Sequence, residues 1–216
     1  VLDDNVRVFD AELAAQGHYE GATVTLARQG GANADDVFSA SGELVFVDND
    51  SSVTLGGTTI GEFLQLGGIL SIVFNANATE ELVNQALSAI AYQNTSSTPP
   101  ASVVIEWTFD DGNTEGKQGS GGALKATGTT TVNITAVNAE PTLDAPDPFT
   151  GHTEDEIATF DFATLKSATN AADSDGSVVG MKVTEVSEGT LYLGATADTA
   201  LPWAVGTNDT IDAATS

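Results

Sequence analysis

TTIGEFLQLGGILSIVF, the stretch from Thr58 to Phe74, is the part of the chain that most directly indicates its fold class. Residues 58–66 and 68–74 are two strand-like runs, rich in β-branched and aromatic side chains. The pair Gly67-Gly68 joins these runs, and a glycine pair in that position predicts the turn of a β-hairpin.

Similar runs, bounded by Gly, Asn, Asp and Ser, occur along the rest of the first part of the chain. They predict further strands at residues 6–9, 22–27, 42–47, 102–109 and 127–137. Many of these runs alternate with a period of two, as one half-buried face of a sheet requires. The sequence therefore predicts an all-β fold.

One segment has a helical period instead. Between Ala78 and Tyr92, apolar residues recur at helical spacing: Leu82, Val83, Ala86, Leu87 and Ile90. Asn77 stands three positions before Glu80, which is the spacing of a capping pair. We therefore expect one amphipathic helix, at about residues 78–92, which covers the core of the sheet.

A change in composition predicts a domain boundary near residue 139. A strand-like run ends at Val137, and the stretch from Pro141 to Thr150 is rich in Pro and Asp. We expect one domain over residues 1–139 and the start of a second over 140–216, with strands near 156–161, 177–186 and 190–193. The second domain is short for a β-sandwich, so we expect it to be truncated or split, as part of a longer protein.

The charge of the chain is strongly unbalanced. It has 31 Asp and Glu residues against 6 Lys and Arg, a formal net charge of -25, and no cysteine. Such a chain lacks the basic face that nucleic acids and anionic membranes require, and it can form neither disulfides nor thiolate metal sites. No apolar run is long enough to insert into a membrane. We also expect the protein to be a monomer.

Many of these acids stand in short clusters at the ends of strand-like runs, where like charges oppose compaction. Calcium takes six to eight oxygen ligands from carboxylates, amides, carbonyls and water, so bound Ca²⁺ would neutralise such clusters. The residues predicted as ligands fall into two sets. The first set is Asp10, Glu12, Asp110, Asp111 and Asn113; the second is Asn138, Glu140, Glu154, Asp155, Asp173 and Asp175.

The second set is the stronger of the two. Asp173 and Asp175 are two positions apart, so on an extended stretch their side chains point to the same side, and Gly176 allows a tight turn. Asp110–Asn113, by contrast, is also an ordinary turn sequence. We expect the acids of residues 35–36 and 48–50 to be exposed loop residues.

A set of motifs covers most of the chain. They are the runs at residues 8–13 and 21–28, Asn84–Thr95, Trp107–Asn113, the linker-like run Thr131–Pro141, and the acidic runs 153–155 and 172–176. In this order they resemble the cadherin-like repeats of giant bacterial RTX adhesins.

This resemblance implies tandem Greek-key (cadherin- or Ig-like) β-sandwiches with Ca²⁺ at the joints between neighbouring repeats. It also implies type I secretion, an extracellular location at the bacterial cell surface, and a role in cell adhesion and biofilm formation. The linker departs from the family pattern. It reads Asn138-Ala139-Glu140-Pro141 where the family more often has Asn-Asp-Ala-Pro, which shifts the carboxylate by one position.

Other function classes have weaker support. His18 and His152 stand outside any recognisable catalytic motif, and the sequence has no nucleophile elbow, phosphate loop or dinucleotide fingerprint. We therefore expect that the protein is not an enzyme. A carbohydrate-binding module that contacts surface glycans is one alternative, and it would need exposed aromatics from among Tyr19, Tyr92, Trp107 and Trp203. We expect Trp107 and Trp203 to be packed. A self-assembling surface-layer domain is the other alternative.

Overall fold

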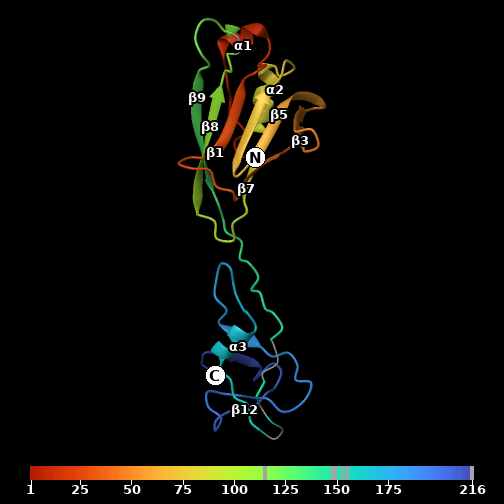
Figure 1. The fold of residues 1–216 in the computed structure, drawn as a ribbon, viewed down its shortest axis with the longest axis vertical. Coiled ribbons are helices and arrows are strands. Elements are labelled where there is room, and N and C mark those ends of the chain that lie inside the picture. Colours follow the sequence, from red (N-terminus) through yellow and green to blue (C-terminus); the bar gives the residue numbers. More distant parts are fainter. Residues whose placement is uncertain (114–115, 147–149, 152, 154–155, 215–216) are drawn as a thin grey trace. The chain divides into compact units, whose positions relative to one another are not determined.

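The structure is a computed structural model that describes residues 1–113, 116–146, 150–151, 153 and 156–214. The chain divides into two compact units, Val1–Ala136 and Val137–Ser216, and each is described by itself. The described part is mostly β, with thirteen strands and three short helices (Figure 1). None of its helices has the length and apolar character needed to cross a membrane.

The first unit is built on a seven-stranded antiparallel sheet with the order β3-β4-β5-β6-β1-β8-β9. Strands β2 and β7 pair separately as a second, smaller sheet. The strands span β1 Thr23–Arg28, β2 Asp36–Ala40, β3 Leu44–Val47, β4 Ser52–Leu55, β5 Thr58–Leu66, β6 Ile69–Phe74, β7 Ile90–Asn94, β8 Ser102–Asp110 and β9 Lys125–Asn133. The helices of this unit are α1 Ala11–Gln16 and α2 Glu80–Ser88.

The predicted hairpin is confirmed. Strands β5 and β6 pair with Leu66 opposite Ile69, and the turn between them is Gly67-Gly68. Both glycines have a positive φ, 59° and 82°, which a residue with a side chain adopts only at a cost. Gly68 is also sterically required, because a Cβ there would lie 1.8 Å from the carbonyl oxygen of Asn33.

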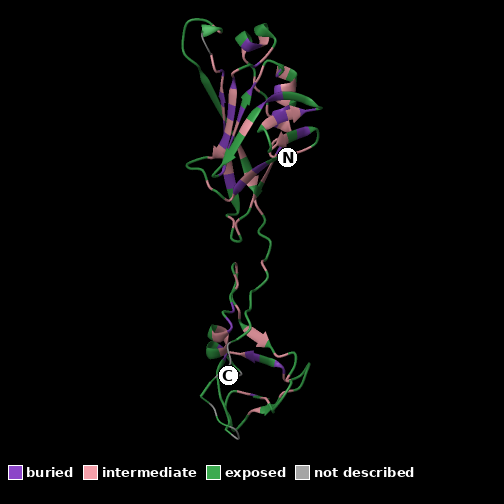
Figure 2. Cartoon of the chain, turned by 45° about the vertical axis from the view of Figure 1, so that its right-hand side comes forward, coloured by how far each residue is buried: buried purple, intermediate pink, exposed green. Residues whose placement is uncertain are grey.

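One face of the large sheet forms the core of the unit. Val24 and Leu26 of β1, and Leu70 and Ile72 of β6, are buried, while their neighbours in sequence point the other way. Val83, Ala86 and Leu87 of α2 belong to the same core, as do residues of both sheets. In Figure 2 the buried residues of this unit lie along its strands and on its helices.

The helix expected at residues 78–92 is confirmed only in part. It spans Glu80–Ser88, and its N-cap is Thr79, whose side chain accepts a hydrogen bond from the backbone N–H of Leu82, so the expected cap Asn77 is wrong. From Ile90 on, the chain forms β7 against β2. The apolar residues Ile90 and Tyr92 suit either period, and tertiary pairing decides between them.

The strands differ from expectation in two further respects. Residues 6–9 form no strand, although Val6 and Val8 pack on the core. Strands β2, β4 and β7 are missing from the prediction. Each of them is only four or five residues long, too short for a clear alternating pattern.

The second unit has little regular structure. It contains α3 Phe162–Ala168, and two short pairs of strands, β10 Gly180–Lys182 with β13 Thr210–Asp212, and β11 Tyr192–Leu193 with β12 Leu201–Pro202. Its small core consists of Phe162, Leu193 and Ile211, with Trp203 among the residues packed against them. The strand expected at 156–161 is wrong, because Asp161 instead caps α3 by accepting from the backbone N–H of Thr164 at 2.7 Å.

Candidate metal site

The turn that carries Asp173 and Asp175 is fixed by its own side chains. The carboxylate of Asp173 accepts a hydrogen bond from the backbone N–H of Asp175, at 3.2 Å. The same carboxylate lies against Gly176, where an added Cβ would be 2.8 Å from Oδ2 of Asp173. Glycine at position 176 therefore lets the two half-buried carboxylates share one tight turn.

The linker-like residues Asn138–Glu140 reach this turn within the second unit. Oδ2 of Asp175 accepts a hydrogen bond from the backbone N–H of Ala139, at 2.8 Å. Asn138 and Glu140, on either side of Ala139, are exposed. The side-chain NH2 of Asn138 donates a hydrogen bond to the carbonyl of Ala139 at 2.9 Å. The side-chain oxygen of Asn138 therefore remains available as a metal ligand.

Backbone pairing keeps the two stretches together. Thr142 and Ala172 exchange two hydrogen bonds, of 2.7 and 3.1 Å, and form an antiparallel bridge. The N–H of Asp144 then donates to the carbonyl of Thr169 at 2.8 Å. Residues 139–144 thus run beside residues 169–175, and this pairing places the linker against the acidic turn.

One oxygen of Asp175 is unsatisfied. Its Oδ1 atom is the one buried side-chain oxygen or nitrogen of the described residues for which the structure shows no hydrogen-bond partner. Burying a carboxylate oxygen without a partner is costly, so such an atom calls for an explanation such as a bound water or ion. A cation bound to Oδ1 would remove this cost.

The structure describes fewer candidate metal ligands at this site than the sequence predicts. Within the described ranges, no three His, Asp or Glu side chains come together in a group that could hold a metal ion. Glu154 and Asp155 lie outside the described residues. The structure thus brings together Asp173, Asp175 and the segment 138–140. For a calcium ion, these would supply two carboxylates, an amide oxygen and backbone carbonyls.

In the first unit, Asp10 and Glu12 belong to α1. Asp10 is the N-cap, and its Oδ1 accepts a hydrogen bond from the backbone N–H of Leu13 at 2.9 Å. Glu12 is exposed in the first turn of the helix. Both positions favour an acid for helix stability alone, because the N-terminus of a helix has unpaired N–H groups and a partial positive charge.

The other three residues of the first set hold the connection between β8 and β9. Asp110 accepts from the N–H of Gly112 at 2.9 Å and forms an ion pair with Lys125 at 3.3 Å. Asp111 is 7% exposed and accepts from the N–H groups of Asn113 and Leu124. The side-chain oxygen of Asn113 accepts from the N–H of Gln118. These bonds give each of the three residues a structural role without a metal.

The acids expected in exposed loops differ from one another. Asp48 and Asp50 are exposed, as predicted. For Asp36 the prediction is wrong, because this residue is 1% exposed and opens β2. Its carboxylate is held by the guanidinium of Arg28, the hydroxyl of Tyr92 and the side-chain amide of Asn94. The sequence analysis did not predict this cluster around Asp36. The one feature of the sequence that indicates it is Arg28, a charged residue at the end of an apolar strand.

The four aromatic residues considered for sugar binding are all packed. Tyr19 is fully buried and Trp107 is 6% exposed, in agreement with the core position expected for Trp107. The hydroxyl of Tyr92 donates to Asp36. Trp203 packs in the second core, as expected, and its Nε1 donates to the carbonyl of Val183 at 3.2 Å. Tyr19 and Trp107 are thus buried and Tyr92 and Trp203 half-buried, whereas a sugar-stacking platform requires an exposed ring.

Comparisons of the chain with models of protein families, with curated proteins and with solved structures gave no match.

Proposed function

We propose that this chain is a calcium-stiffened module of a large bacterial cell-surface adhesin. In this proposal it consists of Greek-key, cadherin-like β-sandwich repeats and acts as an extender, or as the support of a ligand-binding region, in cell adhesion and biofilm formation. Its partners are neighbouring repeats of the same polypeptide. The observation that carries the proposal is the buried, unpartnered Oδ1 atom of Asp175, beside Asp173 and the segment 138–140.

The donor chemistry supports calcium over other metals. The available ligands are oxygens, and the chain has no cysteine. Oxygen-only sites suit hard cations, and the irregular geometry of a turn and a linker suits Ca²⁺ better than Mg²⁺, which demands a near-ideal octahedron. The net charge of -25 adds a general attraction for cations.

The arrangement of the first unit supports the sandwich part of the proposal. Strands β2 and β7 pair apart from the seven-stranded sheet, yet Phe38 of β2 and Ile90 of β7 belong to the same core as Leu26 and Ile72. A core enclosed between two antiparallel sheets is the architecture of a β-sandwich.

The expected affinity fits an extracellular role. Extracellular calcium modules bind with Kd values of about 10⁻⁴ to 10⁻³ M. At a free calcium concentration about tenfold above Kd, one site stabilises the folded state by about 1.4 kcal/mol. In a chain of marginal stability this is enough to make the order of residues 138–144 depend on calcium.

Isothermal titration calorimetry of the full chain tests the site. We expect wild type to bind Ca²⁺, and Asp175→Asn to lose at least one site, while Asp198→Asn, which changes an exposed acid of the same unit, retains it. Equal binding by the two variants would contradict the assignment. The cellular role needs a separate measurement. Bacteria whose surface protein lacks this segment should adhere less under flow in millimolar calcium, and unchanged adhesion would contradict the proposed role.

A further inference from the structure

The face of the large sheet that points away from the core carries an apolar patch. On β5 and β6 the outward side chains are Leu64, Leu66, Ile69 and Val73, with exposed fractions of 65%, 73%, 40% and 47%. We call these four residues the outer patch. The strand register makes the patch continuous, because Leu66 lies opposite Ile69 and Leu64 opposite Ser71, next to Val73. Contiguous exposed apolar surface of this kind marks an interaction site more often than scattered apolar residues do.

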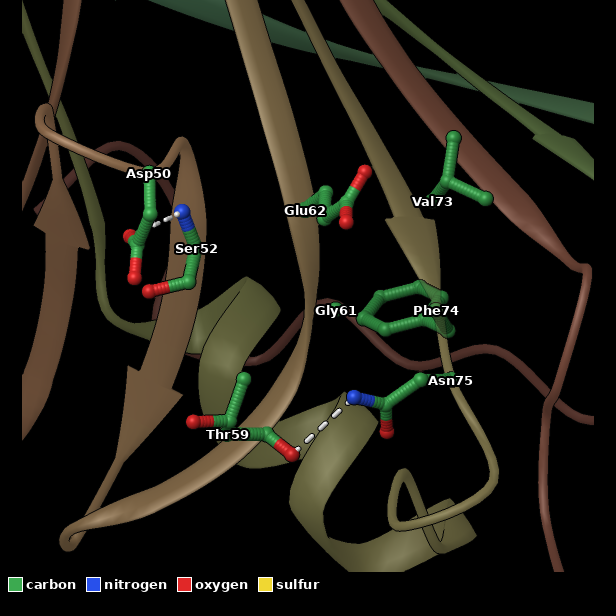
Figure 3. Close-up of a pocket in the computed structure, with 8 residues that line it drawn as sticks. All are labelled: Asp50, Ser52, Thr59, Gly61, Glu62, Val73, Phe74 and Asn75. Atoms are coloured by element: carbon green, nitrogen blue, oxygen red, sulfur yellow. Dashed lines mark hydrogen bonds between the residues drawn. The ribbon is translucent and has the colours of Figure 1, made fainter.

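A polar hollow adjoins the outer patch. It has a volume of about 390 Å³ and is lined by Asp50, Ser52, Thr59, Gly61, Glu62, Val73, Phe74 and Asn75 (Figure 3). We call it the acidic hollow. Glu62 lies directly opposite Val73 in the hairpin, so the hollow and the patch share an edge. Gly61, in the lining, is sterically required, since a Cβ there would lie 2.3 Å from the carbonyl oxygen of Val73.

The charges of the hollow are of one sign. Asp50 and Glu62 are exposed, and of the described residues that line the hollow none is Lys or Arg. One carboxylate oxygen of Asp50 accepts from the N–H of Ser52 at 3.1 Å. The side chain of Asn75 is engaged at both ends, since its amide nitrogen donates to the carbonyl of Thr59 (Figure 3) and its oxygen accepts from the N–H of Asn77, so Asp50 and Glu62 supply the charge of the hollow. A guanidinium or ammonium group complements such a surface, because it offers several donors and a positive charge.

We propose that this face docks an extended segment of another protein, with an Arg or Lys in the acidic hollow and apolar side chains on the outer patch. Glu62, Leu64 and Leu66 follow one another at every second position and therefore point to one side of β5. A strand laid along β5 presents its own side chains with the same period. The fitting segment accordingly has a basic residue followed by apolar residues two and four positions on.

The charge of the chain argues against a second copy as the occupant. The net charge is -25, and only six residues are basic. Five of these six, Arg7, Arg28, Lys125, Lys166 and Lys182, already form an ion pair or a hydrogen bond within the chain. Another copy would therefore bring mainly like charge to the hollow. Nucleic acids and anionic lipids are repelled for the same reason.

The experiment is an NMR titration of the full chain with the synthetic peptide acetyl-SRSLSLS-amide, in which Arg, Leu and Leu occupy every second position. We expect saturable shifts confined to the amides of β4, β5 and β6. Leu64→Ser should weaken binding about tenfold, and Glu62→Gln a few-fold with a smaller dependence on salt. The matched controls are Leu201→Ser, whose side chain is also 65% exposed, and Glu188→Gln, another exposed acid, and both should bind like wild type.

Two control peptides separate recognition from plain charge attraction. Acetyl-SRSSSSS-amide keeps the arginine without the apolar side chains, and acetyl-SESLSLS-amide reverses the charge. Both should fail to produce saturable shifts at these strands. The proposal is overturned if either control binds as well as the test peptide, if no saturable shift occurs, or if the shifts spread over the acidic surface. Shifts at the outer patch that depend on protein concentration alone would assign the face to self-association instead.

Discussion

The guanidinium of Arg28, on β1, holds the carboxylate of Asp36, on β2, through two hydrogen bonds of 2.9 and 2.6 Å. The side chain of Asp36 is fully buried and that of Arg28 is 20% exposed. Because β1 belongs to the seven-stranded sheet and β2 to the smaller pair, this ion pair ties the two sheets of the first unit together.

We expect Asp36→Ala to destabilise the first unit by about 3 kcal/mol, because it leaves the arginine largely buried without its partner. The hydroxyl of Tyr92 and the amide of Asn94 would also lose their acceptor. Urea denaturation followed by Trp107 fluorescence, in a Trp203→Phe background, measures this unit. The exposed acid variant Asp48→Asn should change the free energy of unfolding by less than about 0.5 kcal/mol. Equal effects of the two substitutions would refute the structural role of the pair.

The same pair predicts a dependence on pH. Burial raises the pKa of the Asp36 carboxyl, but the hydrogen bonds from Arg28, Tyr92 and Asn94 outweigh it, so this pKa lies below its ordinary value. In the unfolded chain the pKa of an Asp carboxyl is about 3.9. The stabilisation by the pair is therefore complete above that pH and is lost as the pH falls through the pKa of the folded state. The difference in unfolding free energy between wild type and Asp36→Asn should therefore shrink in acid. If this difference in unfolding free energy stays constant, or grows, down to about pH 3, folding does not lower the pKa of Asp36.

The two glycines of the β5–β6 turn should respond differently to alanine. Gly67→Ala meets open space and bears only the cost of a positive φ, about 1 kcal/mol. Gly68→Ala bears the same cost and also drives its Cβ into the carbonyl of Asn33, so we expect a loss of about 3 kcal/mol or more. Urea denaturation of both variants gives the comparison. If the two losses are equal, the contact between the turn and Asn33 is not present in solution.

A short chain of hydrogen bonds fixes the N-terminal segment. Nε1 of Trp107 donates to the hydroxyl of Thr130 at 3.0 Å, and this hydroxyl donates to the carboxylate of Asp3 at 2.8 Å. Thr130→Val should cost about 1–2 kcal/mol, because the indole N–H loses its acceptor. It should also speed the hydrogen exchange of the Leu2 amide, which is bonded to the carbonyl of Ile90. Thr129→Val, at the exposed neighbouring position, is the control, and equal exchange rates in the two variants would count against this role.

The sequence predicted the strands that have strong patterns and missed the features that depend on tertiary contacts. The hairpin of β5 and β6, and the long strands β8 and β9, follow from local alternation and turn residues. The end of α2 and the start of β7 do not, because pairing with β2 decides them. The burial of Asp36 was hidden for a similar reason: its partner Arg28 is eight positions away in sequence, and the other two partners lie in β7.

The candidate metal site shows the same division. The closeness of Asp173 and Asp175 follows from their spacing and from Gly176. The bond from the backbone of Ala139 to Asp175 depends instead on the pairing of Thr142 with Ala172, which no local pattern indicates. The sequence predicted Glu140 as a ligand together with Asp173 and Asp175; the structure brings the backbone of its neighbour Ala139 to the turn, and Glu140 itself is exposed.

Thermal unfolding of the second unit with and without calcium is the most direct test of the central claim, that Ca²⁺ satisfies the buried oxygen of Asp175. It is followed by Trp203 fluorescence in a Trp107→Phe background. We expect millimolar calcium to raise the Tm of this unit by about 5 °C relative to a chelator, and Asp175→Asn to abolish the rise while Asp198→Asn keeps it. A wild-type Tm that is the same in calcium and in chelator would contradict the account.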